Sequence, residues 1–350
     1  MKSTEKIQRT TPPYPPSFID RLLRFIEKLP IPYWATYLLL FIVQSLINHV
    51  LIWVDGGAPF PTFHRISLIF PLWLWIPLAI VTFLNKTSET TLDNFRPLLT
   101  MDDDTFNELK YKFTTNPRQG VVISSAIWLI VIITIHFSSR DLYARLGYGS
   151  PVLNLVSLLE GVLSYSIGSV LYYQSLRQLW LVNRTLKTVK RFNLFNLNPV
   201  YAFSRLTAWT GISWVFMAVC TLLLFPLEFA PELLLGFVII QFGLAFAAFV
   251  LPLRFVNSSL VLEKLRLLTE HQQRVESTLA RLHQQIDQNE LSEMEPLNYA
   301  VAALNAERDI LEKIPTLPWR TETLKGFLSA TVLPIILLII QMIIQKWLGG

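Results

Sequence analysis

The sequence predicts an all-α, polytopic membrane protein with seven transmembrane helices and a helical hairpin outside the membrane. Hydrophobic residues make up 52% of the 350 residues and charged residues only 16%, and the mean hydropathy is +0.43. An ordinary soluble domain carries about 25% charged residues, so much of this surface does not face water. Two further observations support the fold class: seven long apolar runs, and two apolar stripes at heptad spacing before the last run.

The apolar runs are each long enough to cross about 30 Å of hydrocarbon, which takes about 20 helical residues. They cover residues 33–54, 66–84, 120–137, 151–173, 207–225, 233–253 and 327–348. We therefore divide the chain into a tail, a six-helix region, a hairpin and a seventh helix, which cover residues 1–32, 33–253, 254–320 and 321–350. Seven is an odd number, so the two termini are expected on opposite sides of the membrane.

The positions of the basic residues predict the orientation. Cytoplasmic loops hold an excess of Lys and Arg, and 26 of the 30 such residues lie in 1–32, 85–119, 174–206 and 254–325. The N-terminus is therefore expected inside and the C-terminus outside, in the plasma membrane or, in a bacterium, the inner membrane. We interpret the basic segments as topology signals that contact anionic headgroups. No recognisable nucleic-acid-binding fold surrounds them, so no nucleic acid is expected as a partner.

Three further features lie in segments that are expected on the cytoplasmic side. Residues 1–32 are polar over too long a stretch for a signal peptide and are interpreted as a retained tail. The aspartates of 102–104 lack the glycine and glutamate of a calcium loop and are interpreted as the acidic start of a short helix. The fourth run continues as a helical pattern beyond the membrane to the Asn-rich stretch 192–199.

The segment 254–320 is predicted to form an antiparallel coiled-coil hairpin. Apolar positions alternate by four and three in its first half, and the same spacing resumes after an acidic stretch at 287–296. A helix of about 33 residues would project roughly 50 Å from the bilayer. The first stripe comprises Val261, Leu265, Leu268, Gln272, Val275, Leu279, Leu282 and Ile286, and the second Leu297, Val301, Leu304, Arg308 and Leu311.

Catalytic and cofactor signatures are not found in the sequence. It contains no phosphate-binding glycine loop, no HExxH zinc motif and no GxSxG nucleophile motif, and only one cysteine, Cys220. We therefore predict no enzyme activity, no catalytic residue, no cofactor and no metal site. His49, His64 and His136 could meet near the outer face as a zinc or proton-sensing cluster, but ordinary interfacial histidines are the favoured interpretation.

Polar side chains within the spans are the candidates for an intramembrane polar pocket, because each is costly in hydrocarbon. They are Gln44, Asn48, Asn154, Glu160 and Gln241. Glu160 is the one acidic residue within a span, and a functional role and a structural hydrogen-bonding role remain equally open for it. On the same helix the small residues Ser157, Gly161, Ser164 and Gly168 predict close helix packing.

The last span carries a polar face. Gln341 and Gln345 are one helical turn apart, and Leu337 and Leu338 adjoin them one turn earlier. These four residues are the pore-lining candidates, because a polar spot on an apolar helix must meet a partner helix or water. An interhelical hydrogen bond within one subunit is the alternative.

The arrangement as a whole resembles the seven-transmembrane ion-channel superfamily of insect odorant and gustatory receptors and its distant, including prokaryotic, relatives. In that family the last span carries Thr-Tyr, five apolar residues and Gln-Phe. Here the apolar residues 336–340 and Gln341 match, whereas Pro334, Ile335 and Met342 replace the other positions. The resemblance implies a homotetramer with the last helices around a pore, the cytoplasmic helices as the anchor between subunits, and a small-molecule ligand bound in the outer half.

The alternative function is that of a membrane-anchored scaffold or signalling protein. In that case the cytoplasmic coiled coil would recruit a partner protein, and no pore would be needed.

Overall fold

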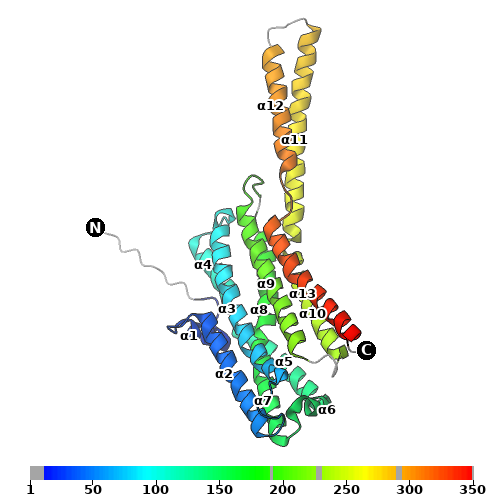
Figure 1. Ribbon diagram of the computed structural model, residues 1–350. Coiled ribbons are helices and arrows are strands. Elements are labelled where there is room, and N and C mark those ends of the chain that lie inside the picture. The colour runs from blue at the N-terminus through cyan, green and yellow to red at the C-terminus, as the bar shows by residue number, and fades with distance from the viewer. Residues whose placement is uncertain (1–11, 190–191, 226–230, 289–293, 349–350) are drawn as a thin grey trace, which may run out of the picture.

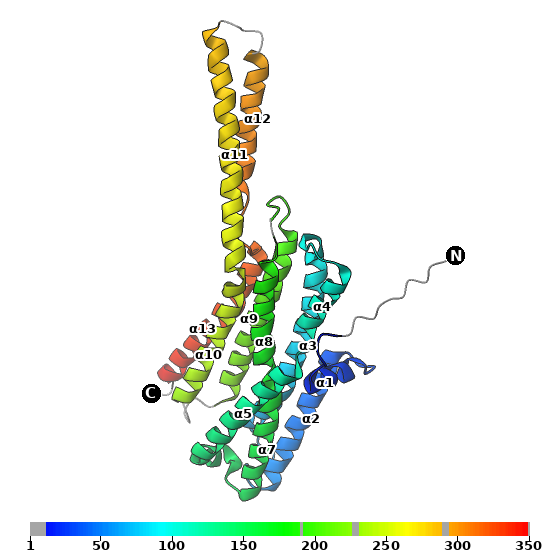
Figure 2. The same ribbon diagram turned by 180° about the vertical axis from the view of Figure 1, so that it is seen from behind.

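The computed structural model describes residues 12–189, 192–225, 231–288 and 294–348. These residues are almost entirely helical and contain no β-strand. Figures 1 and 2 show a bundle of long helices from one end of which a pair of helices projects. In the described residues, six helical segments are long and apolar enough to cross a membrane. The prediction of a multi-pass, all-helical membrane protein is therefore confirmed.

Thirteen α-helices are found in the described residues. They are α1 Phe18–Glu27, α2 Tyr33–Val54, α3 Ile69–Phe95, α4 Asp103–Thr114, α5 Arg118–Ser138, α6 Arg140–Tyr143, α7 Pro151–Gly168, α8 Val170–Leu186, α9 Asn198–Leu224, α10 Pro231–Val250, α11 Arg254–Asp287, α12 Met294–Lys313 and α13 Thr321–Leu348. The predicted seventh span falls on α13. The side chains of residue 335 and of residues 337–350 lie outside the described residues, and the seventh span, like the orientation, stays a prediction.

The segment 1–32 is more than a tail, because it contains the packed helix α1. Ser17 and Asp20 form a reciprocal capping box at its start, and Ile19, Leu23 and Ile26 are buried on one face. The backbone N–H of Asn116 also donates to Asp20 Oδ2 at 3.0 Å, which ties α1 to the start of α5. Burial raises the pKa of the Asp20 carboxyl above its usual value.

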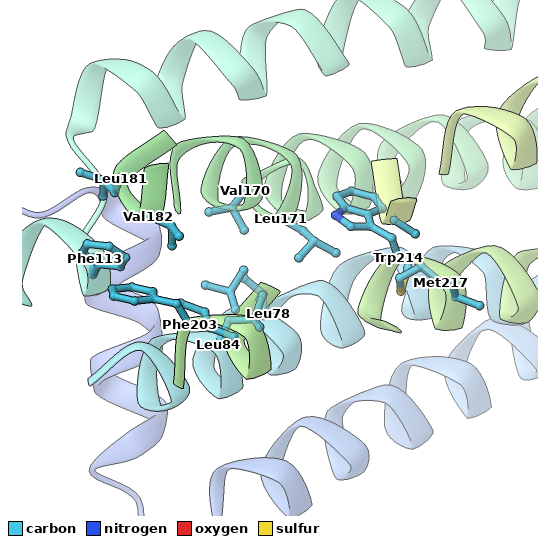
Figure 3. Close-up of a cluster of buried hydrophobic side chains, with 14 of the residues drawn as sticks. Leu78, Leu84, Phe113, Val170, Leu171, Leu181, Val182, Phe203, Trp214 and Met217 are labelled. Atoms are coloured by element: carbon cyan, nitrogen blue, oxygen red, sulfur yellow. The ribbon is translucent and has the colours of Figure 1, made fainter. Parts of the chain in front are cut away.

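The core of the bundle surrounds α3, which packs on α2, α7 and α9. Figure 3 shows how side chains of α3, α4, α8 and α9 meet there, with Phe113 of α4 and Phe203 of α9 toward one end and Trp214 and Met217 toward the other. Leu78, Leu84 and Phe203 are fully buried. The fully buried core continues from α3 into α8 and α9, so these three helices form the centre of the bundle.

The helix α7 approaches α3 closely through its small residues. Ser157, Gly161, Ser164 and Gly168 are all buried. A Cβ atom on Gly168 would lie 2.0 Å from the backbone oxygen of Trp73. The predicted single span 151–173 is in fact two helices that meet at Ser169, and the second of them, α8, runs on to Leu186.

The helices α11 and α12 lie side by side and run in opposite directions (Figures 1 and 2). At the base of this pair, Lys264 Nζ donates to the carbonyl oxygens of Glu312 and Ile314 at 2.7 and 2.9 Å. Farther out, Arg274 Nη1 lies 3.1 Å from Glu307 Oε1. The Lys264 contacts join the start of α11 to the end of α12, so the pair is closed at the bundle.

The buried stripe of α11 differs from the predicted one. Leu268, Val275, Leu279 and Leu282 are half-buried, as a seam requires, but Val261, Leu265, Gln272 and Ile286 are exposed. His271, which is 5% exposed, takes the position expected for Gln272. Its Nδ1 lies 3.2 Å from Glu307 Oε2, and this contact turns His271 rather than Gln272 toward α12. A regular coiled coil stays a prediction.

Candidate functional site

A cavity of about 480 Å³ lies in the half of the bundle opposite the projecting pair. The helices α3, α5, α7, α9 and α10 and the segment 139–148 contribute to it. Its lining is largely aromatic and aliphatic, and the aromatic residues are Phe70, Trp128, Tyr143, Tyr148, Tyr165, Phe225 and Phe237. Such a lining binds apolar or aromatic molecules by dispersion and by excluding water.

The turn at Gly147 forms one wall of the cavity, at the end of the bundle. Gly147 has φ +88°, a left-handed conformation that side-chain-bearing residues rarely adopt. This turn allows Leu146 and Tyr148 on either side of it to be buried and to line the cavity. Gly57 from the preceding loop packs against it, since a Cβ there would lie 2.5 Å from the Gly147 oxygen.

The cavity has few polar groups. The Tyr148 hydroxyl is buried and has no hydrogen-bond partner in the described part of the chain. Burial raises the pKa of this phenol well above its usual value, so the hydroxyl keeps its proton and can donate. Thr221 Oγ1 is already engaged, because it accepts from Trp73 Nε1 at 3.3 Å and donates to the Met217 oxygen at 2.8 Å. Tyr143 and Tyr165 also belong to the lining, so three phenols are available as donors at this site.

Three of the predicted polar candidates come together between α2 and α7. Gln44 Nε2 donates to Glu160 Oε1 at 3.0 Å, and Asn48 Nδ2 donates to Glu160 Oε2 at 2.9 Å. Trp75 Nε1 donates to Gln44 Oε1 at 2.7 Å, and Asn48 Nδ2 also reaches the Ser67 oxygen at 3.2 Å. Both carboxylate oxygens thus accept a hydrogen bond, and the cluster joins α2, α3 and α7 within the membrane-spanning region.

The other polar candidates lie elsewhere. The Asn154 amide oxygen lies 3.1 Å from His136 Nε2 rather than near Glu160. Gln241 is fully buried, and neither of its amide atoms has a partner among the described residues. The side chains of Leu337, Leu338, Gln341 and Gln345 lie outside the described residues, so the pore-lining prediction is not tested.

The histidines His49, His64 and His136 do not form one cluster, because only the first two lie together. The His64 backbone N–H donates to His49 Nε2 at 3.1 Å, and the His49 ring stacks on Phe63, whereas His136 pairs with Asn154. Among the described residues, no group of three or more His, Cys, Asp or Glu side chains could hold a metal ion.

Removing the buried amide of Gln241 should stabilise the protein. An unpaired buried polar group costs about 1–3 kcal/mol, and leucine fills a similar volume without that cost. We therefore expect Gln241→Leu to raise the thermal unfolding temperature in detergent, whereas Gln44→Leu, which breaks existing hydrogen bonds, should lower it. A decrease for Gln241→Leu would mean that its amide has a partner in the folded protein.

The long apolar helices indicate a membrane-embedded, multi-pass helical protein. Its candidate site is an aromatic cavity, and the buried polar cluster around Glu160 is a second feature of the same bundle. In comparisons with protein-family models, curated proteins and solved structures, none matched this chain.

Proposed function

We propose that this chain is a ligand-responsive membrane protein of the seven-transmembrane ion-channel type, in which the aromatic cavity binds a small apolar molecule. The cavity carries the proposal. Its volume of about 480 Å³ lies within the range of small-molecule sites. The ligand expected is an apolar or aromatic molecule with one hydrogen-bond acceptor for a tyrosine hydroxyl of the lining.

The helix α10 connects the cavity to the last helix, which supports a response to the ligand. Phe237 and Ile240 of α10 line the cavity. Nearer the C-terminal end of α10, Phe249 stacks on Phe327 of α13, with ring centroids 3.9 Å apart. Phe327 also lies against Gly211 of α9, where a Cβ would be 2.7 Å from its ring. A ligand that shifts α10 would therefore act directly on the proposed pore helix.

The first experiment fills the cavity. A panel of small aromatic molecules that carry one hydrogen-bond acceptor, such as benzaldehyde, acetophenone and anisole, is titrated into the detergent-solubilised protein, and the quenching of tryptophan fluorescence is measured. At least one should bind the wild type, and Val131→Trp, which places an indole in the cavity, should weaken binding by about tenfold or more. The matched control is Val122→Trp, on the exposed side of the same helix. Equal binding by both variants would contradict the proposal.

The second experiment tests the position of the last helix. Single cysteines at Gln341 and Gln345 in a Cys220→Ser background should crosslink between subunits if α13 surrounds an axis, whereas a cysteine at the exposed Leu46 of α2 should not. An oligomeric preparation in which neither α13 position crosslinks would exclude the axial arrangement.

The scaffold function is the second candidate, and one observation favours it. The projecting helices expose Ile286, Tyr299 and Ile310, which are 47, 69 and 58% exposed. If the partner is a second copy of this chain, Ile310→Glu should abolish the association of the two copies through the hairpin, measured by light scattering. The same variant should leave ligand binding unchanged.

A further inference from the structure

A second cavity, of about 550 Å³, lies at the end of the bundle from which α11 and α12 project. It is formed where α3 meets the first turns of α9 and α13. In contrast to the aromatic cavity, its lining is polar and charged: Thr91, Asn94, Asn198, Arg205, Arg320 and Glu322 contribute side chains. The hollow is open to solvent, since all six of these residues except Thr91 are exposed.

The residues that line this hollow carry a net positive charge. Two arginines, Arg205 and Arg320, and one acidic residue, Glu322, belong to its lining. Arg320 is held in place, because its Nη2 donates to Asn198 Oδ1 and its guanidinium lies 5.2 Å from the centre of the Tyr201 ring. Arg205 has no ion-pair or hydrogen-bond partner in the described part of the chain. One positioned and one uncommitted guanidinium thus remain for an anion.

The positions of the neighbouring apolar runs indicate that the hollow lies near the level of lipid headgroups. The apolar run of α9 begins at residue 207, immediately after Arg205, and that of α13 begins at residue 327, two turns after Arg320. Guanidinium groups bind phosphate through paired N–H donors, and amide and hydroxyl groups add further donors.

We propose that this cavity binds a phosphate group, supplied either by an anionic phospholipid headgroup or by free phosphate. Arg205 and Arg320 bind the charged oxygens. The Glu322 carboxylate repels a second negative charge, so a singly charged phosphodiester is preferred over a dianion. The inference is independent of the aromatic cavity and of its ligand.

The test uses the full chain in nanodiscs or detergent. Native mass spectrometry measures retained lipid when phosphatidylglycerol and phosphatidylcholine are offered at equal amounts, and thermal unfolding in detergent measures the effect of inorganic phosphate. The wild type should retain phosphatidylglycerol in preference to phosphatidylcholine. Arg205→Gln should reduce this preference by about tenfold, the effect of losing one strong charge-assisted contact. Glu322→Gln should increase it, a gain that misfolding cannot produce.

The matched control is Arg254→Gln, which removes one exposed guanidinium at the same end of the bundle but outside the cavity. It should leave the preference unchanged. Stabilisation by inorganic phosphate that is lost in Arg205→Gln, without any lipid preference, would assign the site to free phosphate. Equal retention of the two lipids together with no phosphate effect would overturn the proposal, and so would equal losses in Arg205→Gln and Arg254→Gln.

Discussion

Gly168→Ala should destabilise the bundle more than any other single methyl addition described above. The new Cβ would lie 2.0 Å from the backbone oxygen of Trp73. Trp73 cannot move away easily, because its buried indole stacks on Tyr165 at 5.5 Å and donates a hydrogen bond to Thr221. Overpacking of a well-packed core costs about 1–3 kcal/mol, and a backbone contact this short belongs at the upper end or beyond it.

The measurement is the thermal unfolding temperature of the detergent-solubilised protein, together with the yield of monodisperse material. Gly243→Ala is the matched control, since it lies within α10 and a Cβ there meets nothing within 4 Å. Alanine favours a helix over glycine by about 1 kcal/mol, so this control should be neutral or stabilising. Equal unfolding temperatures for the two variants would show that α7 and α3 are farther apart than described.

Glu160→Leu is expected to have the second largest effect. It removes the acceptor of both Gln44 Nε2 and Asn48 Nδ2. Leaving buried donors without partners costs about 1–3 kcal/mol. Glu160→Gln retains one acceptor oxygen and should cause a smaller loss of stability.

A double-mutant cycle separates this cluster from a simple change of packing. If Gln44 and Glu160 stabilise each other, the loss in Gln44→Leu/Glu160→Leu should be smaller than the sum of the two single losses. Strict additivity would show that Gln44 and Glu160 do not interact, and a Glu160→Leu protein as stable as the wild type would show that Glu160 reaches water instead.

The sequence indicated most of the helices because their apolar runs are long, but α1 was missed. The polar residues of the segment 1–32 conceal the spacing of Ile19, Leu23 and Ile26, which forms one buried face on a short amphipathic helix. The same difficulty affected α11. Heptad spacing gave the right face at Leu268 and Val275, but a histidine paired with Glu307 shifted the buried position between them.

The candidate site was predictable in part. Gln44, Asn48 and Glu160 stood out because each polar group is costly in hydrocarbon, but that cost does not say which of them meet. The partners depend on how each helix is rotated, so Asn154 and Gln241 could not be separated from the cluster. The aromatic cavity gave no signal, because Trp128 and Tyr165 on apolar helices look the same whether they face lipid or a cavity.

The arm formed by α11 and α12 has a mechanical consequence. Both of its helices are joined to the bundle at the base, since α11 follows α10 and α12 leads into α13. Lys264 also holds the two helices together there. The 34 residues of α11 span about 51 Å, so each degree of tilt at the base moves the far end by about 0.9 Å. The base of α11 contacts α8, so a small rotation of the membrane helices at this point would displace the far end of the arm by several ångströms, enough for a second molecule to sense.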